Sequence, residues 1–326
     1  MSNYKVAFIN PLPDYIPRFL ETVPEGFELE VVRKEAPVEE KCRAVEDADF
    51  LISGVETPEE VFRAGKKLKF IQYMSSGFGQ LPPEVLDDLS VPVAQMKAHS
   101  ISVAEHAVTL AMMALRRIPY AQAAMKEGKW RENLDELSFS ELYHKTVGIV
   151  GLGNIGRWIA KICSKGFDAD VVYYDRLDMP LTVEELIPAK AVSLDELFKV
   201  SDVVFVCLPF NEESDKLIGK EHFALMGPRG VVVNISRGEV IRQDELIEAL
   251  ETGQIAAAGL DVYDREPLSM DSKLRTMEQV ILTPHMAGVG WENVERRVVV
   301  VWDNLQRVLR GEEPRGVVTR IRKAPR

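Results

Sequence analysis

The chain is 326 residues long, about twice the size of a usual domain, so we expect two domains. Hydrophobic residues make up 46% and charged residues 28% of the sequence, a globular composition that excludes disordered and fibrous proteins. Forty basic against fifty-one acidic residues give a net charge of −11, which repels phosphate backbones and anionic lipids. We therefore expect neither nucleic acid nor a membrane as a partner.

The cysteine content and the hydropathy pattern indicate a cytoplasmic protein. Cys42, Cys163 and Cys207 have no metal-ligand spacing, and three cysteines do not make a disulfide framework. The strand-like segment Lys5–Ile9 is soon followed by prolines and is too short for a signal-peptide core. No apolar run approaches the roughly 18 residues that a membrane span requires. We expect a soluble cytoplasmic protein without a metal site.

Short β-branched runs alternate with helical stretches, which is the pattern of parallel sheets built from βαβ units. The first five strands are predicted at Lys5–Ile9, Leu29–Val32, Phe50–Ser53, Phe70–Met74 and Val91–Ala94. A long helix is predicted next, from Ser102 to about Lys126, with Ser102 and Glu105 in the spacing of a capping box. Such a helix could connect two domains.

Six further strands follow, and their near-continuous apolar runs are typical of strands covered by helices on both faces. They are predicted at Thr146–Val150, Val171–Tyr174, Val203–Cys207, Val231–Ile235, Ala257–Val262 and Val280–Thr283. Six strands complete a doubly wound domain, so the helix from Trp291 to about Arg310 is expected to pack back on the first domain. The sequence predicts an α/β fold with two doubly wound parallel-sheet domains, residues 1–99 completed by 291–326, and residues 100–290.

A glycine-rich segment, Gly151-Leu152-Gly153-Asn154-Ile155-Gly156, directly follows the predicted strand Thr146–Val150 and opens a helix. In this context the first glycine permits a tight turn, the second lets backbone approach a pyrophosphate, and the third lets the helix pack on the strand. The helix amino terminus then offers N–H groups and a positive dipole end to the anion. Asp175, placed 24 residues after Gly151, could bind both ribose hydroxyls of NAD and repel the 2′-phosphate of NADP. The segment predicts a dinucleotide site.

Three further polar groups each come just after a predicted strand of the second series. Arg237 carries a planar fork that matches a carboxylate and could polarise an adjacent carbonyl. Glu266 precedes a proline in a loop, and His285 lies in Thr-Pro-His. Taken alone, Arg237 favours a ligand site over a surface arginine in a turn, Glu266 is as well explained by a structural role, and a lone histidine is more often structural than catalytic. Together they are expected to converge, because parallel strands present their carboxyl ends at one edge of the sheet.

These motifs together resemble the D-isomer-specific 2-hydroxyacid dehydrogenase family over essentially the whole chain. Matches are found in five segments: Gly151–Gly156, Asn234–Gly238, the Leu-Asp-Val segment leading to Glu266-Pro267, Thr283–His285 and Val103–His106. The resemblance implies a Rossmann NAD-binding domain inserted into a flavodoxin-like substrate domain. It also implies a homodimer that acts on a 2-hydroxy or 2-oxo acid.

The resemblance assigns roles to the three polar groups. Arg237 is expected to bind the substrate carboxylate and its 2-oxo group, and His285 to act as acid and base with Glu266 as its carboxylate partner. This agrees with the chemistry, because hydride arrival at a ketone carbon builds negative charge on oxygen, which imidazolium and guanidinium can neutralise. A neighbouring carboxylate favours imidazolium and holds one tautomer.

The resemblance further implies which residues bind the two ligands. Contacts with the substrate are expected from Ser76, Gly77, Phe78, Arg237 and His285. Contacts with NAD are expected from the glycines Gly151, Gly153 and Gly156 and from Asn154, Ile155, Asp175, Leu208, Pro209, Ser214, Ile235, Ser236, Arg237, Asp261, His285 and Gly288.

The chain departs from the family pattern at several loop positions. Phe210-Asn211 replaces a common Leu-Thr, Glu239 replaces a glycine, and Lys97 and His99 replace glycine and asparagine. These departures leave the substrate open. The remaining histidines, which we interpret as non-catalytic, are His106, His144 and His222.

Two other functions compete with this interpretation. Formate dehydrogenases of the same fold carry glutamine in place of Glu266, and phosphite dehydrogenases favour a basic residue near Ser75 and Ser76, so both are disfavoured. An NAD-sensing scaffold, like the transcriptional corepressors of this family, would bind NADH but turn over poorly. The acidic chain without long disordered tails argues mildly against a scaffold.

The substrate side chain is expected to be uncharged. The loop Tyr73–Phe78 carries no cation, and Met286 and Trp291 follow the catalytic histidine. A second anionic group on the substrate would need a further basic residue to offset its desolvation. We predict a preference for medium-sized uncharged 2-oxo acids over phosphohydroxypyruvate or oxaloacetate, unless Lys97 or His99 reaches a distal anion.

Overall fold

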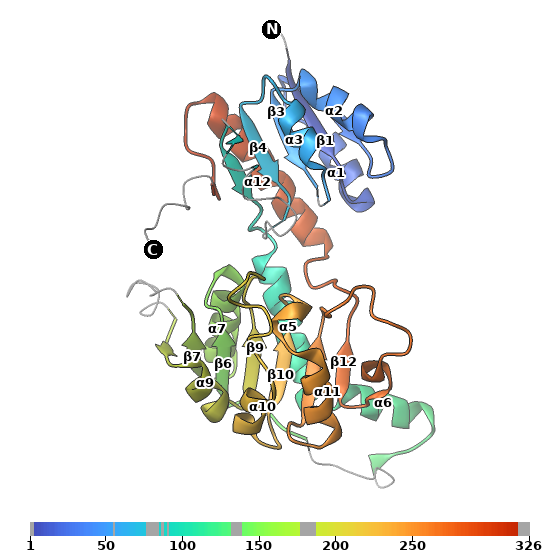
Figure 1. The fold of residues 1–326 in the computed structure, drawn as a ribbon, viewed down its shortest axis with the longest axis vertical. Coiled ribbons are helices and arrows are strands. Elements are labelled where there is room, and N and C mark those ends of the chain that lie inside the picture. Colours follow the sequence, from blue (N-terminus) through green and yellow to red (C-terminus); the bar gives the residue numbers. More distant parts are fainter. Residues whose placement is uncertain are drawn as a thin grey trace. The chain divides into compact units, whose positions relative to one another are not determined.

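The computed structural model of the chain describes residues 3–54, 56–75, 85, 88–89, 91–131, 139–176 and 187–318. The chain divides into two compact units (Figure 1). One unit is formed by Met1–His99 together with Gly290–Arg326, and the other by Ser100–Val289. Each unit is built on one parallel sheet, which confirms the predicted fold class.

The first unit contains a five-stranded parallel sheet in the order β2-β1-β3-β4-β5, the order of flavodoxin-like folds. Its strands are β1 (Tyr4–Ile9), β2 (Phe27–Val32), β3 (Phe50–Ser53), β4 (Phe70–Tyr73) and β5 (Val93–Gln95). Its helices are the short η1 (Pro13–Tyr15) followed by α1 (Ile16–Glu21), α2 (Val38–Glu46), α3 (Glu59–Ala64) and α12 (Trp291–Leu309).

The faces of this sheet are buried against different helices because side chains alternate along each strand. On β3, Phe50 and Ile52 join the core that contains Trp302 of α12, while Leu51 joins the core beneath α2 and α3. Helix α12 therefore packs on the first sheet although it follows the second sheet in sequence, as the strand count predicts. Burying a large apolar side chain such as Phe50 contributes about 1.5–3 kcal/mol.

The second unit contains a seven-stranded parallel sheet in the order β12-β11-β10-β9-β6-β7-β8. Its strands are β6 (Thr146–Val150), β7 (Asp170–Tyr174), β8 (Ala189–Ala191), β9 (Val203–Val206), β10 (Val231–Asn234), β11 (Ala257–Leu260) and β12 (Val280–Leu282). The chain moves outward from β6 to β8 and then returns to β9 on the other side of β6. The carboxyl ends of β6 and β9 therefore form the switch point at which open α/β sheets bind ligands.

Helices cover both faces of the second sheet. Val203 and Phe205 of β9 face the core with α5 and α7, while Val204 and Val206 face the core with α9, α10 and α11. The helices are α5 (Ser100–Leu115), α6 (Ile118–Lys126), α7 (Asn154–Gly166), α9 (Leu194–Val200), α10 (Lys220–Met226) and α11 (Gln243–Glu251), with the short η3 (Gly238–Val240) and η4 (Lys273–Thr276).

Three details differ from the sequence-based expectation. The single helix predicted from Ser102 to Lys126 is two helices, because Arg117 has a left-handed φ of 46° and Pro119 starts the next helix. Helix α5 also begins at Ser100, so the predicted capping box lies inside the helix. The edge strand β8 was not predicted, since one of its three residues is half-buried, the other two are exposed, and they form no apolar run.

None of the helices in the described part of the chain is long and apolar enough to cross a membrane.

Candidate active site

The glycine-rich segment forms a tight turn between β6 and α7. Gly151 has a φ of 101°, a conformation that favours glycine, and a Cβ atom at Gly156 would lie 2.3 Å from the Gly151 carbonyl oxygen. At Gly153, which caps α7, a Cβ would meet no heavy atom within 4 Å. The turn therefore leaves open space above the helix amino terminus.

Asp175 follows β7 and turns its carboxylate toward this turn. Its Oδ2 atom accepts a hydrogen bond of 2.9 Å from the backbone N–H of Leu152. The carboxylate is therefore held beside the glycine-rich turn, in the place where the Rossmann fold puts the ribose of a dinucleotide. The open space at Gly153, the exposed amino terminus of α7 and this carboxylate fit NAD.

The loop after β10 is folded by the side chain of Asn234. Its Oδ1 accepts hydrogen bonds from the backbone N–H and the hydroxyl of Ser236, and its Nδ2 donates to the Arg237 carbonyl. Gly238 packs so closely on the next loop that a Cβ would lie 1.9 Å from the carbonyl carbon of Tyr263. In the Asn-x-x-Arg-Gly motif, Asn234 and Gly238 thus have structural roles in folding the loop. Arg237, which lies between them, is half-buried.

The side chains of Glu266 and His285 form a hydrogen bond across two loops. The Nδ1 atom of His285 lies 2.7 Å from Glu266 Oε2, and Glu266 Oε1 accepts the backbone N–H of Tyr263. The His285 side chain is 49% exposed, so its Nε2 atom is available to a ligand. The loops of Arg237, Glu266 and His285 follow the neighbouring strands β10, β11 and β12, at one edge of the sheet.

The loop of His285 is held by a buried network around Asp261. Asp261 Oδ1 accepts from the Thr283 hydroxyl and the Met286 N–H, and its Oδ2 accepts from the Ala287 N–H. The backbone N–H of His285 donates to the Asp261 carbonyl at 2.9 Å. This network stabilises the left-handed φ of 51° at His285, which is unfavourable for a residue with a Cβ.

Tyr263 connects the loop that carries Glu266 with the end of β12, before His285. Its hydroxyl donates to the carbonyl oxygens of Thr283 and Leu260. Burial, together with the nearby charge of Asp261, raises the pKa of the Tyr263 phenol to about 12, so the hydroxyl remains a donor at physiological pH. Tyr263 therefore fixes the separation between the Glu266 loop and the end of β12.

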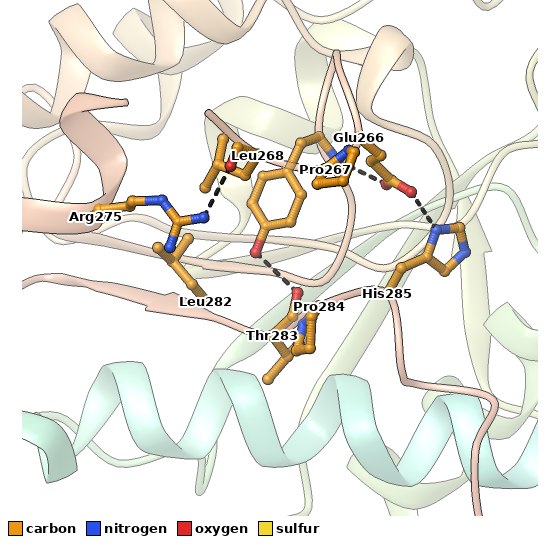
Figure 2. A pocket seen from close by; sticks show the side chains of 9 residues that line it. Glu266, Pro267, Leu268, Arg275, Leu282, Thr283, Pro284 and His285 are labelled. Carbon is orange, nitrogen blue, oxygen red and sulfur yellow. Dashed lines mark hydrogen bonds and ion pairs between the residues drawn. The ribbon is translucent and has the colours of Figure 1, made fainter. Parts of the chain in front are cut away.

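A cavity of about 660 Å³ lies beside the Glu266–His285 pair. Figure 2 shows the Glu266 loop and the end of β12 around it. Tyr263 also lines the cavity. Its walls are mostly apolar, and the guanidinium of Arg275 is bonded to the carbonyl oxygens of Leu268 and Ser269. The lining residues are Tyr263, Glu266, Pro267, Leu268, Arg275, Leu282, Thr283, Pro284 and His285.

The other residues expected to bind NAD lie along the same edge of the second sheet. Asn154 and Ile155 begin α7, and Ser214 is buried with its hydroxyl bonded to the Pro209 carbonyl. The remaining ones follow the ends of β9, β10, β11 and β12: Leu208, Pro209, Ile235, Ser236, Asp261 and Gly288. Both carboxylate oxygens of Asp261 are turned toward the His285 loop.

Apart from Arg237 and His285, the residues predicted for the substrate side do not belong to the second unit. Ser76, Gly77 and Phe78 fall outside the described residues. In the first unit Lys97 is exposed and His99 is buried. Within the described ranges, no group of three or more His, Cys, Asp or Glu side chains could hold a metal ion.

Sequence reasoning missed the residues that position the site. The family resemblance implies only a structural role in the helix for His106 and does not name its contacts. Its Nε2 atom lies 3.0 Å from Thr283 Oγ1 and 3.6 Å from Asp261 Oδ1. Tyr263 was not singled out either. Both residues fall inside motifs that the sequence matches, at Val103–His106 and before Glu266, and that position was the available signal.

Comparison with known proteins identifies the family. The model of the D-isomer specific 2-hydroxyacid dehydrogenase NAD-binding domain matches residues 108–287, more than half of the chain. The chain belongs to the D-isomer specific 2-hydroxyacid dehydrogenases. This confirms the resemblance, and it makes the chain an NAD-binding oxidoreductase.

Individual members of the family are similar over most of this chain. A glyoxylate reductase of Korarchaeum cryptofilum is 34% identical, with 92% of each chain covered. A D-3-phosphoglycerate dehydrogenase of Methanocaldococcus jannaschii is also 34% identical over 96% of this chain, which spans 59% of that longer protein. The solved structure of Rhodotorula graminis D-mandelate dehydrogenase has a TM-score of 0.82 at 27% identity and covers 98% of both chains.

Proposed function

We propose that this dehydrogenase reduces 2-oxo acids to D-2-hydroxy acids with NADH, using Arg237, Glu266 and His285. The observation that carries the proposal is the 2.7 Å contact between His285 Nδ1 and Glu266 Oε2, next to the strand that presents Arg237. An imidazole held by a carboxylate at one nitrogen can transfer a proton at the other. That arrangement suits a carbonyl that becomes a hydroxyl.

Each group has a separate task in this mechanism. NADH, when bound, supplies the hydride that reduces the substrate carbonyl carbon. Arg237 binds the substrate carboxylate through its planar guanidinium and polarises the adjacent 2-oxo group. Protonated His285 donates from Nε2 to the oxygen on which negative charge develops, and Glu266 keeps the proton on Nδ1. In the oxidative direction neutral His285 accepts the hydroxyl proton.

The cofactor would be held at the switch point of the second sheet. The turn at Gly151–Gly156 and the amino terminus of α7 would bind the pyrophosphate, and Asp175 the ribose hydroxyls. We propose a preference for NAD over NADP, because the Asp175 carboxylate would repel a 2′-phosphate. Residues 100–290 would thus form the dinucleotide domain, and residues 1–99 with 291–326 the substrate domain.

For the substrate we propose medium-sized uncharged 2-oxo acids. The apolar cavity beside His285 supports this, since the guanidinium of Arg275 is already bonded to two carbonyl oxygens. Ser76, Gly77 and Phe78 would bind the substrate carboxylate through their backbone. The two relatives that are 34% identical to this chain differ in the charge of the acid in their names. One is a glyoxylate reductase and the other a D-3-phosphoglycerate dehydrogenase.

We further propose that the enzyme is a cytoplasmic homodimer, as the family habit implies. Its three cysteines are free thiols, which suits a reducing compartment.

A substrate panel tests the proposal. Specificity constants would be measured with NADH for 2-oxobutyrate, 2-oxoisocaproate, phenylpyruvate, hydroxypyruvate, oxaloacetate and phosphohydroxypyruvate. We expect the best values among the singly charged acids, with about a tenfold gain for two more carbons if the pocket accepts them. A best value for either doubly anionic acid would contradict the apolar pocket, and NADH binding without turnover on any acid would indicate a scaffold.

A further inference from the structure

An ion pair joins the loops on either side of the dinucleotide turn. Arg176, the first residue after Asp175, pairs through its guanidinium with the carboxylate of Glu213. Arg176 follows β7 and Glu213 lies in the loop after β9, while β6 lies between these two strands in the sheet. The pair therefore connects the two loops that flank the carboxyl end of β6, where the glycine-rich turn begins.

The loop after β9 is built to present Glu213. Asn211 Oδ1 accepts hydrogen bonds from the backbone N–H groups of Glu213 and Ser214. The Ser214 hydroxyl in turn accepts from the Asn211 N–H and donates to the Pro209 carbonyl. This Asx turn fixes the backbone at Glu213. Asn211 is one of the positions at which the chain departs from the family pattern, so the departure coincides with the turn that orients the carboxylate.

The charges at this place oppose one another. Asp175 repels a 2′-phosphate, whereas a guanidinium one residue further along would attract it, because arginine is the usual partner of a phosphate. With both residues side by side in the chain, Asp175 alone does not determine which dinucleotide binds. The preference between NAD and NADP therefore also depends on whether the Arg176 guanidinium is available to a 2′-phosphate.

We propose that Glu213 is a cofactor-specificity residue: by pairing with Arg176 it withholds this cation from a 2′-phosphate and so completes the exclusion of NADP. The inference rests on the proposed function through the placement of the ribose at Asp175. Both partners are more than half exposed, so the pair is weak and water-screened. The expected effect of breaking it is accordingly about 1.5- to fivefold.

The test compares four variants with the wild-type full-length enzyme. Glu213→Gln removes the pairing charge, and Arg176→Ala in the Glu213→Gln background removes the released cation. Glu251→Gln is the matched control, because Glu251 forms an exposed pair with Lys273 and lies at the end of α11, where the chain returns to the amino ends of the strands. Asp175→Ala tests the ribose placement separately.

Two readouts are measured for each variant. The first is the dissociation constant of NADPH and of NADH, from the fluorescence of the bound dinucleotide without substrate. The second is the NADPH-to-NADH ratio of kcat/KM with one 2-oxo acid. Glu213→Gln should tighten NADPH binding and raise this ratio about 1.5- to fivefold. The double variant should lose the gain, and Glu251→Gln should match the wild type.

Each failure points to a different conclusion. An unchanged NADPH affinity in Glu213→Gln, while Asp175→Ala shifts the ratio, would overturn this inference and leave the proposed function intact. A gain that persists in the double variant would also overturn it, because the effect would then come from the charge of Glu213 itself. A ratio that Asp175→Ala does not change would overturn both the ribose placement and the inference.

Discussion

The glycine-rich turn and the loop that carries His285 lie at the same edge of one sheet but are built in opposite ways. The turn owes its shape to missing side chains, since Gly151 has a left-handed φ and Gly156 has no room for a Cβ. The loop of His285 owes its shape to side chains, because the carboxylate of buried Asp261 binds two of its backbone N–H groups.

The turn and the His285 loop should therefore respond differently to substitution. A change in the turn acts through sterics on the backbone and should impair cofactor binding before chemistry. A change at the tip of the His285 loop should remove only the proposed proton donor, because the Asp261 network still holds the backbone. The two regions should therefore be separable by measuring cofactor affinity and the rate of the chemical step independently.

The largest expected effect comes from removing the proton donor. His285→Ala should lower kcat for 2-oxo acid reduction by about 10²- to 10⁴-fold, the usual contribution of general acid catalysis. NADH affinity, measured by fluorescence titration, should change far less. His144→Ala is the control, because His144 lies in the same unit before β6 and is interpreted as non-catalytic. A variant with wild-type kcat would remove His285 from the mechanism.

In the glycine-rich turn, we expect a substitution to weaken NADH binding more than it slows the chemical step. Gly156→Ala forces its Cβ against the Gly151 carbonyl, so the backbone must shift at a cost of about 1–3 kcal/mol. NADH should bind more weakly and the melting temperature should fall. Gly166→Ala, on the same helix with no atom near its Cβ position, should leave both unchanged. Equal NADH affinity in the two variants would mean that the cofactor does not use this turn.

Asp175 tests the cofactor side at a single hydrogen-bonding group. Asp175→Ala should raise the Michaelis constant for NADH roughly ten- to a hundredfold and relax discrimination against NADPH. Asp170→Ala, exposed at the other end of the same strand, is the control. Steady-state kinetics that already favour NADPH in the wild-type enzyme would sink the assignment.

The smallest effect is expected at His222, which lies outside both the glycine-rich turn and the His285 loop. It allows the effect of pH on folding to be measured apart from its effect on catalysis. Burial lowers its pKa below the ordinary value, and Arg242 adds to this, while Glu221 and Asp195 oppose it. The unfolded chain therefore binds a proton below about pH 6.5 that the folded protein does not. By linkage, the free energy of unfolding should decrease as pH falls through this window.

Urea unfolding at pH 7.5 and 5.5 measures this decrease. His222→Asn keeps an oxygen that could accept the Gly219 N–H now bonded to Nδ1, but it cannot titrate. The variant should lose less stability than the wild type between the two pH values. Identical losses would show that His222 is not responsible.

The sequence predicts much of the fold, and it brings out the residues proposed to react, because both leave local patterns. The glycine spacing after β6 and the apolar runs of the central strands follow from backbone sterics and from burial on two faces. Strand β8 leaves no such pattern, since it is a three-residue edge strand with only partial burial. The break at Arg117 is likewise set by one dihedral angle inside an otherwise continuous helical pattern.

The positioning residues were harder to predict because their partners are distant in sequence. His106 meets Thr283 across 177 residues, and Arg176 meets Glu213 across 37. Only the fold brings such residues together. Periodicity and motif spacing indicate only which residues are close along one helix, strand or loop. They therefore predict that His285 lies at a strand end, but they do not predict the hydrogen bonds of Asp261 that hold its loop.

The central claim is that the site transfers a hydride to the 2-carbon of a 2-oxo acid and gives the D product. The most direct measurement uses NADH with deuterium at both C4 positions and the best substrate of the panel, followed by mass spectrometry and chiral separation of the product. We predict one deuterium at C2 and the D configuration, with no product from His285→Ala on the same time scale. A product without deuterium at C2, or with the L configuration, would contradict the account.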